Sequence, residues 1–181
     1  MANHTIFNER PECQDRLIKV LEKLGYKYVS RSEAEEKRGK LSNVLFEDEL
    51  VKFLNMQTYK YKNNNYRFSG ESISKAVRAI DVSLVQGLAM ASKEIYNLLT
   101  LGISVEERIT IDKDSPCVQS FDLHYIDFDH PENNIWQVTE EFSVERTNGQ
   151  YARPDIVLLV NGMPLVVIEC KKSSVDIKEG I

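Results

Sequence analysis

Two apolar segments joined by a short turn constrain this chain more than any other feature. Residues 156–160 and 165–170 are mostly β-branched and aliphatic, and Asn161-Gly162 lies between them. Asn-Gly between two apolar segments is among the strongest short signals for a β-hairpin. Because successive positions are apolar, both strands resemble those that are covered on both faces. The sequence therefore predicts a hairpin in the middle of a sheet, with layers above and below.

The length of the turn decides which residues meet at the open end of this hairpin. With a two-residue turn, Asp155 faces Ile168 and Glu169 points to the other side of the sheet. With a three-residue loop at 161–163, Asp155 lies opposite Glu169, with Cβ atoms roughly 4.5–5.5 Å apart. An odd loop also gives Gly162 the left-handed position of a bulged turn. We therefore predict the three-residue loop, which brings the two carboxylates together.

A pair of carboxylates at this spacing predicts a metal-assisted hydrolytic site. Asp155 and Glu169 repel each other unless a cation lies between them. Mg²⁺ or Mn²⁺ suits the pair, because such ions prefer oxygen ligands and accept two carboxylates plus water. The backbone carbonyl of Cys170 offers a third oxygen. Lys171 follows on the same face, since side chains repeat every two residues, and there it would orient or deprotonate a water or stabilise charge on a phosphate.

At these residues the sequence resembles the PD-(D/E)xK nuclease superfamily. Pro154-Asp155 is followed, after thirteen intervening residues, by Glu169-x-Lys171. The chain is also similar to the N-terminal nuclease domain of type I restriction enzyme R (HsdR) subunits, most strongly over 120–172 and weakly over 31–110. That wider similarity rests on the segments Leu24-Gly25-Tyr26, Ile126-Asp127-Phe128, Asn133-Asn134, Arg153-Pro154-Asp155-Ile156-Val157 and Asn161-Gly162-x-Pro164-Leu165.

The resemblance implies metal-dependent endonucleolytic cleavage of double-stranded DNA. It implies Asp155 and Glu169 as metal ligands and Lys171 as the catalytic lysine. It also implies a longer subunit, with an ATP-driven translocase downstream and methyltransferase and specificity subunits as partners. No Gly-x-x-x-x-Gly-Lys-[Ser/Thr] phosphate loop occurs in the 181 residues, so ATP would belong only to the downstream translocase. A repair or resolving nuclease of the same superfamily, and a docking module without catalysis on the nuclease fold, remain as alternatives.

Periodicity predicts an α/β (α+β mixed) fold with a restriction-endonuclease-like core. Helical spacing of apolar residues predicts helices over 11–24 and 42–55, a third helix capped by Ser72 or Ser74, and a fourth over 89–99. The densely charged stretch 31–40 predicts a solvated loop. After a short strand or turn at 26–30, further strands are expected at 109–111, 118–128, 136–144, 156–160 and 165–170. We expect one nuclease domain over 1–181, in which a helical layer (1–100) flanks a central mixed or antiparallel sheet (101–172).

Several other residues are candidates for supporting roles. Glu12 or Asp15 on the first helix is a possible additional metal ligand, Gln14 an equal candidate for the inward position, and a solvated helix face the preferred interpretation. Glu140 and Glu141 are expected to be exposed, with contact to the metal-binding residues as the alternative, and no role is assigned to the three histidines. The segment 59–68 mixes Tyr, Lys, Arg and Asn, which suits nucleic-acid binding, although tyrosines packed on the core are the preferred interpretation.

Charge and cysteine content exclude some classes of protein. The net charge is −5, and residues 101–181 carry 7 basic and 15 acidic groups. A basic footprint for tight binding of DNA by charge alone is therefore missing, whereas acidic residues around divalent cations are compatible with this balance. No apolar run approaches the roughly 20 residues that span a bilayer, and no secretory signal is visible. Three widely spaced cysteines suit reduced thiols, so we expect a cytoplasmic protein.

Overall fold

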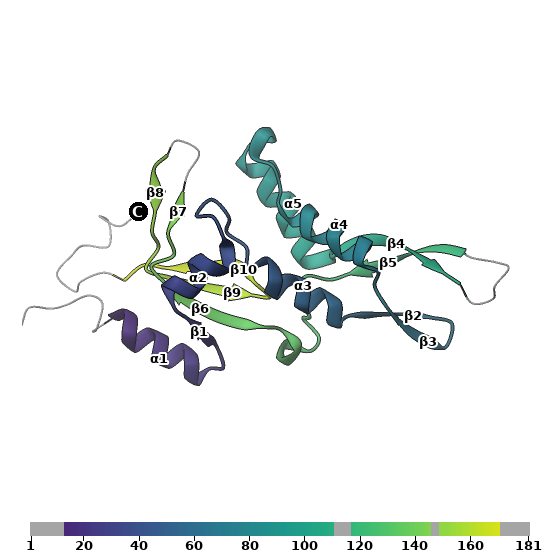
Figure 1. The fold of residues 1–181 in the computed structure, drawn as a ribbon, viewed down its shortest axis with the longest axis horizontal. Helices are drawn as coiled ribbons and strands as arrows, with labels where there is room; N and C mark the ends of the chain where they lie inside the picture. Colours follow the sequence, from purple (N-terminus) through teal and green to yellow (C-terminus); the bar gives the residue numbers. More distant parts are fainter. Residues whose placement is uncertain (1–12, 111–116, 146–148, 171–181) are drawn as a thin grey trace, which may run out of the picture. The chain divides into compact units, whose positions relative to one another are not determined.

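A computed structural model describes residues 13–110, 117–145 and 149–170 (Figure 1). The chain divides into two compact units. Unit 1 combines Met1–Phe46 with Trp136–Ile181, and unit 2 consists of Glu47–Ile135. The predicted hairpin and the carboxylates at its open end belong to unit 1.

Unit 1 is built on a four-stranded mixed sheet. Its strand order is β1 (Lys27–Val29), β6 (Trp136–Glu140), β9 (Ile156–Val160) and β10 (Met163–Ile168). β1 runs parallel to β6, whereas β6 with β9 and β9 with β10 are antiparallel. The mixed α/β class expected from the sequence is therefore confirmed.

The predicted hairpin forms, but not in the middle of the sheet. All five residues of β9 are buried, as expected for a strand covered on both faces. β10 ends the strand order among the described residues, and the exposed fractions of Leu165, Val166 and Val167 are 40, 46 and 59%. The expectation of a central position is wrong for β10, because an apolar segment indicates which surfaces avoid water but not how many strands flank it.

Helices α1 (Asp15–Lys23) and α2 (Arg31–Arg38) cover opposite faces of the sheet (Figure 1). Ile18 and Leu21 of α1 pack in one cluster with Val138, Ile156, Leu158 and Cys170. Ala34 of α2 packs in a second cluster with Val29, Phe46, Phe142, Val157 and Leu159. Alternate residues of β9 thus feed the two clusters, as the two-residue period of a strand requires.

The first two helices differ in how well the sequence predicts them. α1 and the turn at Gly25 agree with the predicted helix over 11–24, although Pro11 lies outside the described residues. The predicted loop over 31–40 is wrong, because α2 occupies Arg31–Arg38. Ser30 and Glu33 form a reciprocal capping box at its N-terminus, and Arg31 pairs with Glu35 one turn along. These local bonds stabilise a short helix that has little apolar periodicity.

The turn between β9 and β10 corrects the predicted loop. Asn161 and Gly162 have φ angles of 52 and 81°, and Val160 pairs with Met163. This is a two-residue turn of type I′, in which both central residues have positive φ. The pairing then shifts between Pro164 and Val166, which leaves Leu165 as the extra residue of a β-bulge. Beyond the bulge Ile168 pairs with Ile156, the register that we predicted from a three-residue loop.

Unit 2 has its own helices, hairpins and core. In chain order its elements are α3 (Glu47–Met56), β2 (Thr58–Tyr61), β3 (Asn64–Arg67), α4 (Gly70–Ile80), the 3-10 turn η2 (Leu84–Gln86), α5 (Leu88–Leu101), β4 (Ile103–Ile109), β5 (Cys117–Leu123) and the 3-10 turn η3 (Pro131–Asn133). β2 pairs with β3 and β4 with β5. Ser69, rather than Ser72 or Ser74, caps α4. Buried side chains such as Leu50, Phe53, Val105 and Leu123 form the core.

The order of elements along the chain is less simple than the predicted layers. β1 of the four-stranded sheet comes from the first thirty residues, while β4 and β5 form a separate two-stranded sheet. A further short pair, β7 (Val144–Glu145) and β8 (Tyr151–Ala152), belongs to unit 1. The sheet is therefore not confined to 101–172. That residues 1–181 make a single nuclease domain stays a prediction.

The structure bears on two expectations about the chain's environment. The described residues contain no helix whose length and apolar character would allow it to cross a membrane. Cys13, Cys117 and Cys170 are free thiols, as expected for a chain without a disulfide framework.

Candidate active site

Asp155 is held at the open end of the β9–β10 hairpin by two hydrogen bonds. The Gln14 side chain donates from Nε2 to Oδ1 of Asp155 at 2.9 Å. The backbone N–H of Cys170 donates to Oδ2 at 2.7 Å. The backbone oxygen of Asp155 also accepts from the N–H of Glu141 at 2.8 Å. The carboxylate is thus fixed between the start of α1 and the end of β10, while the carboxylate oxygens retain further lone pairs.

The bulge in β10 determines how Asp155 and Glu169 relate. Ladder pairing ends at Ile156 and Ile168, so Asp155 and Glu169 are the next positions on the two chains. Without the bulge at Leu165, the two-residue turn would place Asp155 opposite Ile168, and Glu169 would point to the other side of the sheet. Glu169 is exposed and Asp155 is half-buried. Lys171, the predicted catalytic lysine, lies outside the described residues.

Gln14 is the residue of the first helical segment that reaches Asp155. Its exposed fraction is 5%, whereas Asp15 is half-buried and Glu12 lies outside the described residues. Within the described part of the chain, Gln14 Oε1 is buried and has no hydrogen-bond partner. Gln14 therefore takes the inward position, an alternative that the sequence left open, and it brings an orphaned oxygen to the site.

Glu140 is a buried carboxylate, whereas the sequence analysis expected it to be exposed. Its exposed fraction is 7%, and it accepts a hydrogen bond from the Tyr28 hydroxyl at 3.0 Å. It pairs with Ile156, the residue after Asp155. The expectation that Glu140 is exposed is wrong, because its side chain lies on the face of the sheet that α1 covers, the face of Val138 and Ile156. In the sequence, the buried acid was detectable only as a charged residue within a predicted strand.

Glu141 turns away from the strand and binds arginines. It has a positive φ of 46°, and its carboxylate accepts from Arg31 Nη1 at 3.1 Å and lies 4.0 Å from Arg153 Nη1. The pKa of Arg31 is raised by its hydrogen bonds to Glu35 and Glu141. Glu141 is half-buried rather than fully exposed, and its contacts tie α2 to the segment before β9.

A buried arginine supports the same region from the α2 face. Arg38 has an exposed fraction of 4%, and its guanidinium lies 4.0 Å from the centre of the Phe142 ring. It donates to the backbone oxygens of Ala34, Asn43 and Ser143. Burial lowers the pKa of Arg38. Since Phe142 N–H donates to Pro154 O, this anchoring extends to the residue before Asp155.

The donors around Asp155 suit a hard cation that keeps water ligands. Asp155 and Glu169 would supply carboxylates, Cys170 a backbone carbonyl, and Gln14 an amide oxygen that has no hydrogen-bond partner among the described residues. The thiol of Cys170 is 3% exposed and packs in the α1 cluster, as expected for a small apolar side chain. No group of three His, Cys, Asp or Glu side chains among the described residues is arranged to hold a metal. Such a site fits Mg²⁺, which is typically bound by one or two carboxylates plus water, better than a complete protein cage.

A cavity elsewhere contains none of the predicted site residues. It has a volume of about 840 Å³ and lies in unit 2, where Asp122, His124, Asp127 and Glu132 are among its lining residues. Hydrogen bonds from Asn133 and from the His130 backbone lower the pKa of Asp127. These contacts organise the loop after β5, and His124 and His130 acquire no catalytic role from them.

The chain belongs to the family described as type I restriction enzyme R protein N terminus, whose model matches residues 6–181. This family membership confirms the resemblance that the hairpin motif and its neighbouring segments suggested.

Three relatives illustrate the similarity. A protein of Methanocaldococcus jannaschii, assigned as the MjaIXP endonuclease subunit of a type I restriction enzyme, is 27% identical over 166 residues, which cover 91% of this chain and 15% of that protein. The HindI endonuclease subunit of Haemophilus influenzae is 26% identical, covering 88% of this chain and 14% of that protein. The SauCOLORF180P endonuclease subunit of Staphylococcus aureus is 35% identical over 102 residues, 52% of this chain and 11% of that protein. The chain thus spans a small part of each relative.

Proposed function

We propose that this chain is the nuclease module of a type I restriction R subunit and cleaves double-stranded DNA with Mg²⁺ or Mn²⁺. The observation that carries the proposal is the fixed position of Asp155, whose carboxylate is bonded to Gln14 and to the Cys170 N–H. Glu169 follows at the next position in the register beyond the bulge. Membership of the R-protein family and the naming of the relatives as endonuclease subunits support the same activity.

Each residue has a distinct task in this proposal. Asp155, Glu169 and the Cys170 carbonyl hold the cation, and Gln14 Oε1 is available as a further oxygen or as a partner for a bound water. The cation, when bound, lowers the pKa of a water and polarises the phosphate. Lys171 orients or deprotonates the attacking water, or stabilises charge that develops on the phosphate.

The partners follow from the family and are part of the proposal. Double-stranded DNA is the substrate, and a translocase that consumes ATP would lie in the remainder of the subunit. Methyltransferase and specificity subunits would complete the assembly. Because relatives are about seven times longer than the aligned segment, these activities belong to the whole enzyme rather than to the chain alone.

Binding of Mn²⁺ to the 181-residue chain tests the metal site without requiring cleavage. We expect a bound ion that is lost in D155N and weakened at least about tenfold in E169Q, since each change removes a charged ligand. D127N is the matched control, because it removes a carboxylate from the loop after β5 and leaves the hairpin intact. Binding unchanged in D155N would overturn the assignment of the site.

Cleavage is tested in the complete R subunit assembled with its methyltransferase and specificity subunits. We expect D155A and K171A to abolish cutting of DNA while ATP hydrolysis continues, because translocation does not use these residues. Retained cutting in either variant would contradict the proposed mechanism.

A further inference from the structure

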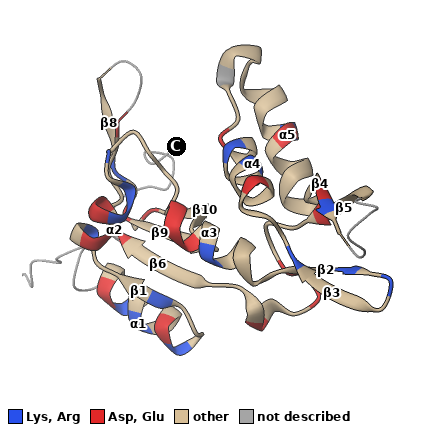
Figure 2. Ribbon diagram, turned by 45° about the vertical axis from the view of Figure 1, so that its right-hand side comes forward, with Lys and Arg blue, Asp and Glu red and all other residues tan. Residues whose placement is uncertain are grey.

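The β2–β3 hairpin concentrates positive charge in an acidic unit. Residues 57–70 contain three basic and no acidic side chains, while residues 47–135 together contain nine basic and fourteen acidic ones. Figure 2 shows blue and no red along this hairpin. Because attraction to a polyanion depends on local rather than net charge, the hairpin is a candidate for contact with nucleic acid despite the acidic total.

The two faces of the hairpin separate its aromatic and its basic residues. Tyr59 pairs with Tyr66, and Tyr59 stacks on Phe121 with ring centres 4.1 Å apart. Tyr59 is 8% exposed, so it packs in the core of unit 2, as the sequence analysis preferred. Lys60 and Arg67 lie on the opposite face, where both are exposed. The hairpin therefore presents cations to solvent and keeps its rings for packing, an arrangement suited to phosphates rather than to bases.

The basic face has a spacing that matches a phosphate backbone. Lys60 pairs with Asn65 and Thr58 with Arg67, which makes Lys60 and Arg67 diagonal neighbours. Diagonal side chains on one face lie about 7–8 Å apart, far enough for the two cations to reach neighbouring phosphates of one strand rather than a single phosphate. Arg67 Nη1 donates to Asn55 O at 3.0 Å, which holds the guanidinium in place. Asn65 adds an amide of the kind that commonly contacts phosphates.

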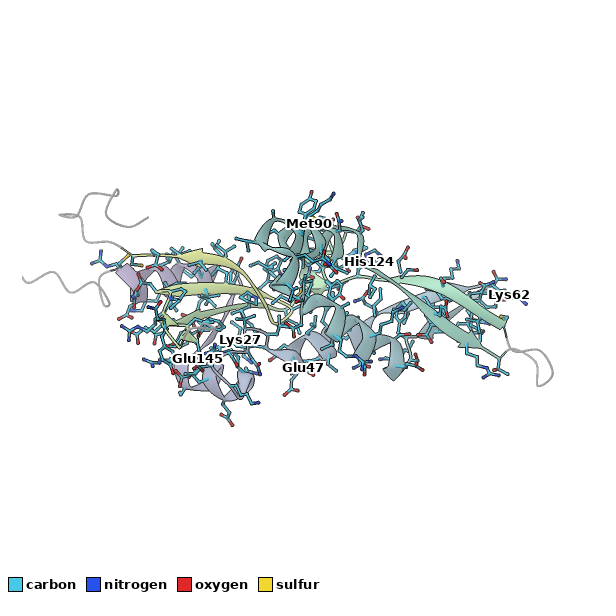
Figure 3. The ribbon with its side chains drawn as sticks, turned by 90° about the horizontal axis from the view of Figure 1, so that it is seen from above. Lys27, Glu47, Lys62, Met90, His124 and Glu145 are labelled. Atoms are coloured by element: carbon cyan, nitrogen blue, oxygen red, sulfur yellow. The ribbon has the colours of Figure 1, made fainter. Side chains whose placement is uncertain are left out.

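A third cation occupies the tip of the hairpin in an unusual backbone conformation. Lys62 has a φ of 53°, a left-handed value that favours Gly or Asn. Asn63, the next residue, would suit this conformation better. The Tyr59–Tyr66 pairing nevertheless sets a register in which Lys62 takes the left-handed position. Figure 3 shows Lys62 at the far end of the hairpin. The turn thus holds Lys62 in a strained backbone conformation, and the tip of the hairpin carries a positive charge.

We infer that the β2–β3 hairpin contacts the DNA backbone through Lys60, Lys62 and Arg67. The contact does not depend on the base sequence of the DNA, because the residues that protrude are cations and amides that bind phosphates. The inference rests on the proposed function for the identity of the polyanion, double-stranded DNA. It adds a substrate-holding surface to a site that is itself built from acids.

Salt-dependent binding of a short DNA duplex tests this inference. The measurement uses the 181-residue chain with D155N, so that no DNA is cut, at salt concentrations from about 50 to 200 mM. Each phosphate contact contributes about 0.9 to the slope of log affinity against log salt, so K60Q/K62Q/R67Q should reduce the slope by about 2 to 3. K62N should reduce it by about 0.9 and should not lower the unfolding temperature, because Asn accepts a left-handed backbone.

A matched control removes the same charges from helices of the same unit. K52Q/R78Q/K93Q changes exposed residues of α3, α4 and α5 and should leave the salt slope within about 0.9 of the parent, less than one phosphate contact. An equal loss of slope in both triple variants would overturn the inference, because it would show attraction to unit 2 in general. Absence of salt-dependent binding by the parent would also overturn it.

The outcomes separate this inference from the proposed function. If the parent chain binds Mn²⁺ through Asp155 but K60Q/K62Q/R67Q binds DNA like the parent, the hairpin inference fails while the nuclease proposal stands; the hairpin would then suit an acidic protein. If the hairpin variant loses its salt slope but Mn²⁺ binding ignores Asp155, the nuclease proposal fails while the DNA-contacting hairpin stands.

Discussion

Gln14 combines a stabilising and a costly feature in one buried side chain. Its Nε2 donates to Asp155, while its Oε1 is buried without a partner among the described residues. Replacing Gln14 by Leu removes both, so the free energy of unfolding should change by less than about 1 kcal/mol. Metal affinity should nevertheless fall about 10- to 100-fold, because Asp155 loses a group that orients it. Isothermal titration with Mn²⁺ and denaturant unfolding measure the two quantities.

An unchanged metal affinity in Q14L would show that Gln14 is only a packing residue. In that case Q14L would keep the parent's affinity for Mn²⁺, whatever happened to stability. Q14E provides the complementary variant, because a second buried carboxylate beside Asp155 destabilises the chain without metal and should give a larger stabilisation on addition of Mn²⁺.

Arg38 illustrates a residue whose geometry matters more than its charge. Its guanidinium donates to three backbone oxygens and lies over Phe142, and the described residues include no carboxylate bonded to it. Lysine keeps the charge but loses the planar fork, so R38K should lower the free energy of unfolding by about 2 kcal/mol or more. R31K is the control on the same helix. Its exposed ion pairs predict a change within about 0.5 kcal/mol, and an equal loss in both variants would contradict the argument.

At the scale of elements, α2 owes its N-terminus to a capping box that titrates. Hydrogen bonds from the Ser30 side chain and backbone lower the pKa of Glu33. A lowered folded-state pKa stabilises the chain fully above the ordinary glutamate pKa of about 4.3, and this stabilisation is lost as the pH falls through the lowered value. As the pH is lowered, E33Q should therefore lose less stability than the parent. The unfolding midpoint at a series of acid pH values measures this difference.

Ser30 provides an independent check on the same box. S30A should lower stability by about 1 kcal/mol at neutral pH, since it removes the helix cap. It should also partly flatten the acid profile, because Glu33 then loses the side-chain hydrogen bond, the larger of the two that lower its pKa. An acid profile unchanged in both variants would show that the box does not contribute to stability.

At the scale of the whole molecule, each unit carries its own spectroscopic probe. Trp136 is the single tryptophan and lies in β6 of unit 1. Tyr125 is fully buried in unit 2, where its hydroxyl donates to Ala76 O at 2.6 Å and burial raises its pKa to about 12. A raised folded-state pKa leaves stability intact below the ordinary tyrosine pKa of about 10 and removes it as the pH rises toward 12.

Alkaline unfolding followed by both probes tests how far the units are coupled. We expect the tyrosinate absorbance that the parent shows and Y125F lacks to report loss of unit 2 above about pH 10, and Y125F to delay that loss at a cost of about 1 kcal/mol at neutral pH. Because each unit has its own core, the Trp136 fluorescence should change in a separate transition. Coincident transitions at every pH would instead support a single cooperative domain.

Local patterns were sufficient for much of unit 1. The Asn-Gly turn signal, the buried strand β9 and the amphipathic helix α1 depend on neighbours in sequence, and the chain encodes them directly. The pairing of Ile156 with Ile168 was predicted from a three-residue loop, whereas a two-residue turn and the bulge at Leu165 produce it. The charged helix α2 was missed because apolar periodicity was used as the test, whereas a Ser-x-x-Glu cap stabilises it.

The sequence by itself determined the family and the proposed site: Asp155 and Glu169 next to two apolar segments, with Lys171 two residues after Glu169. Only the tertiary structure decided which other residues contact these groups. The edge position of β10, the buried Glu140 and the contact from Gln14 depend on segments far apart in the chain. Such contacts arise from packing between elements, which local residue patterns do not encode.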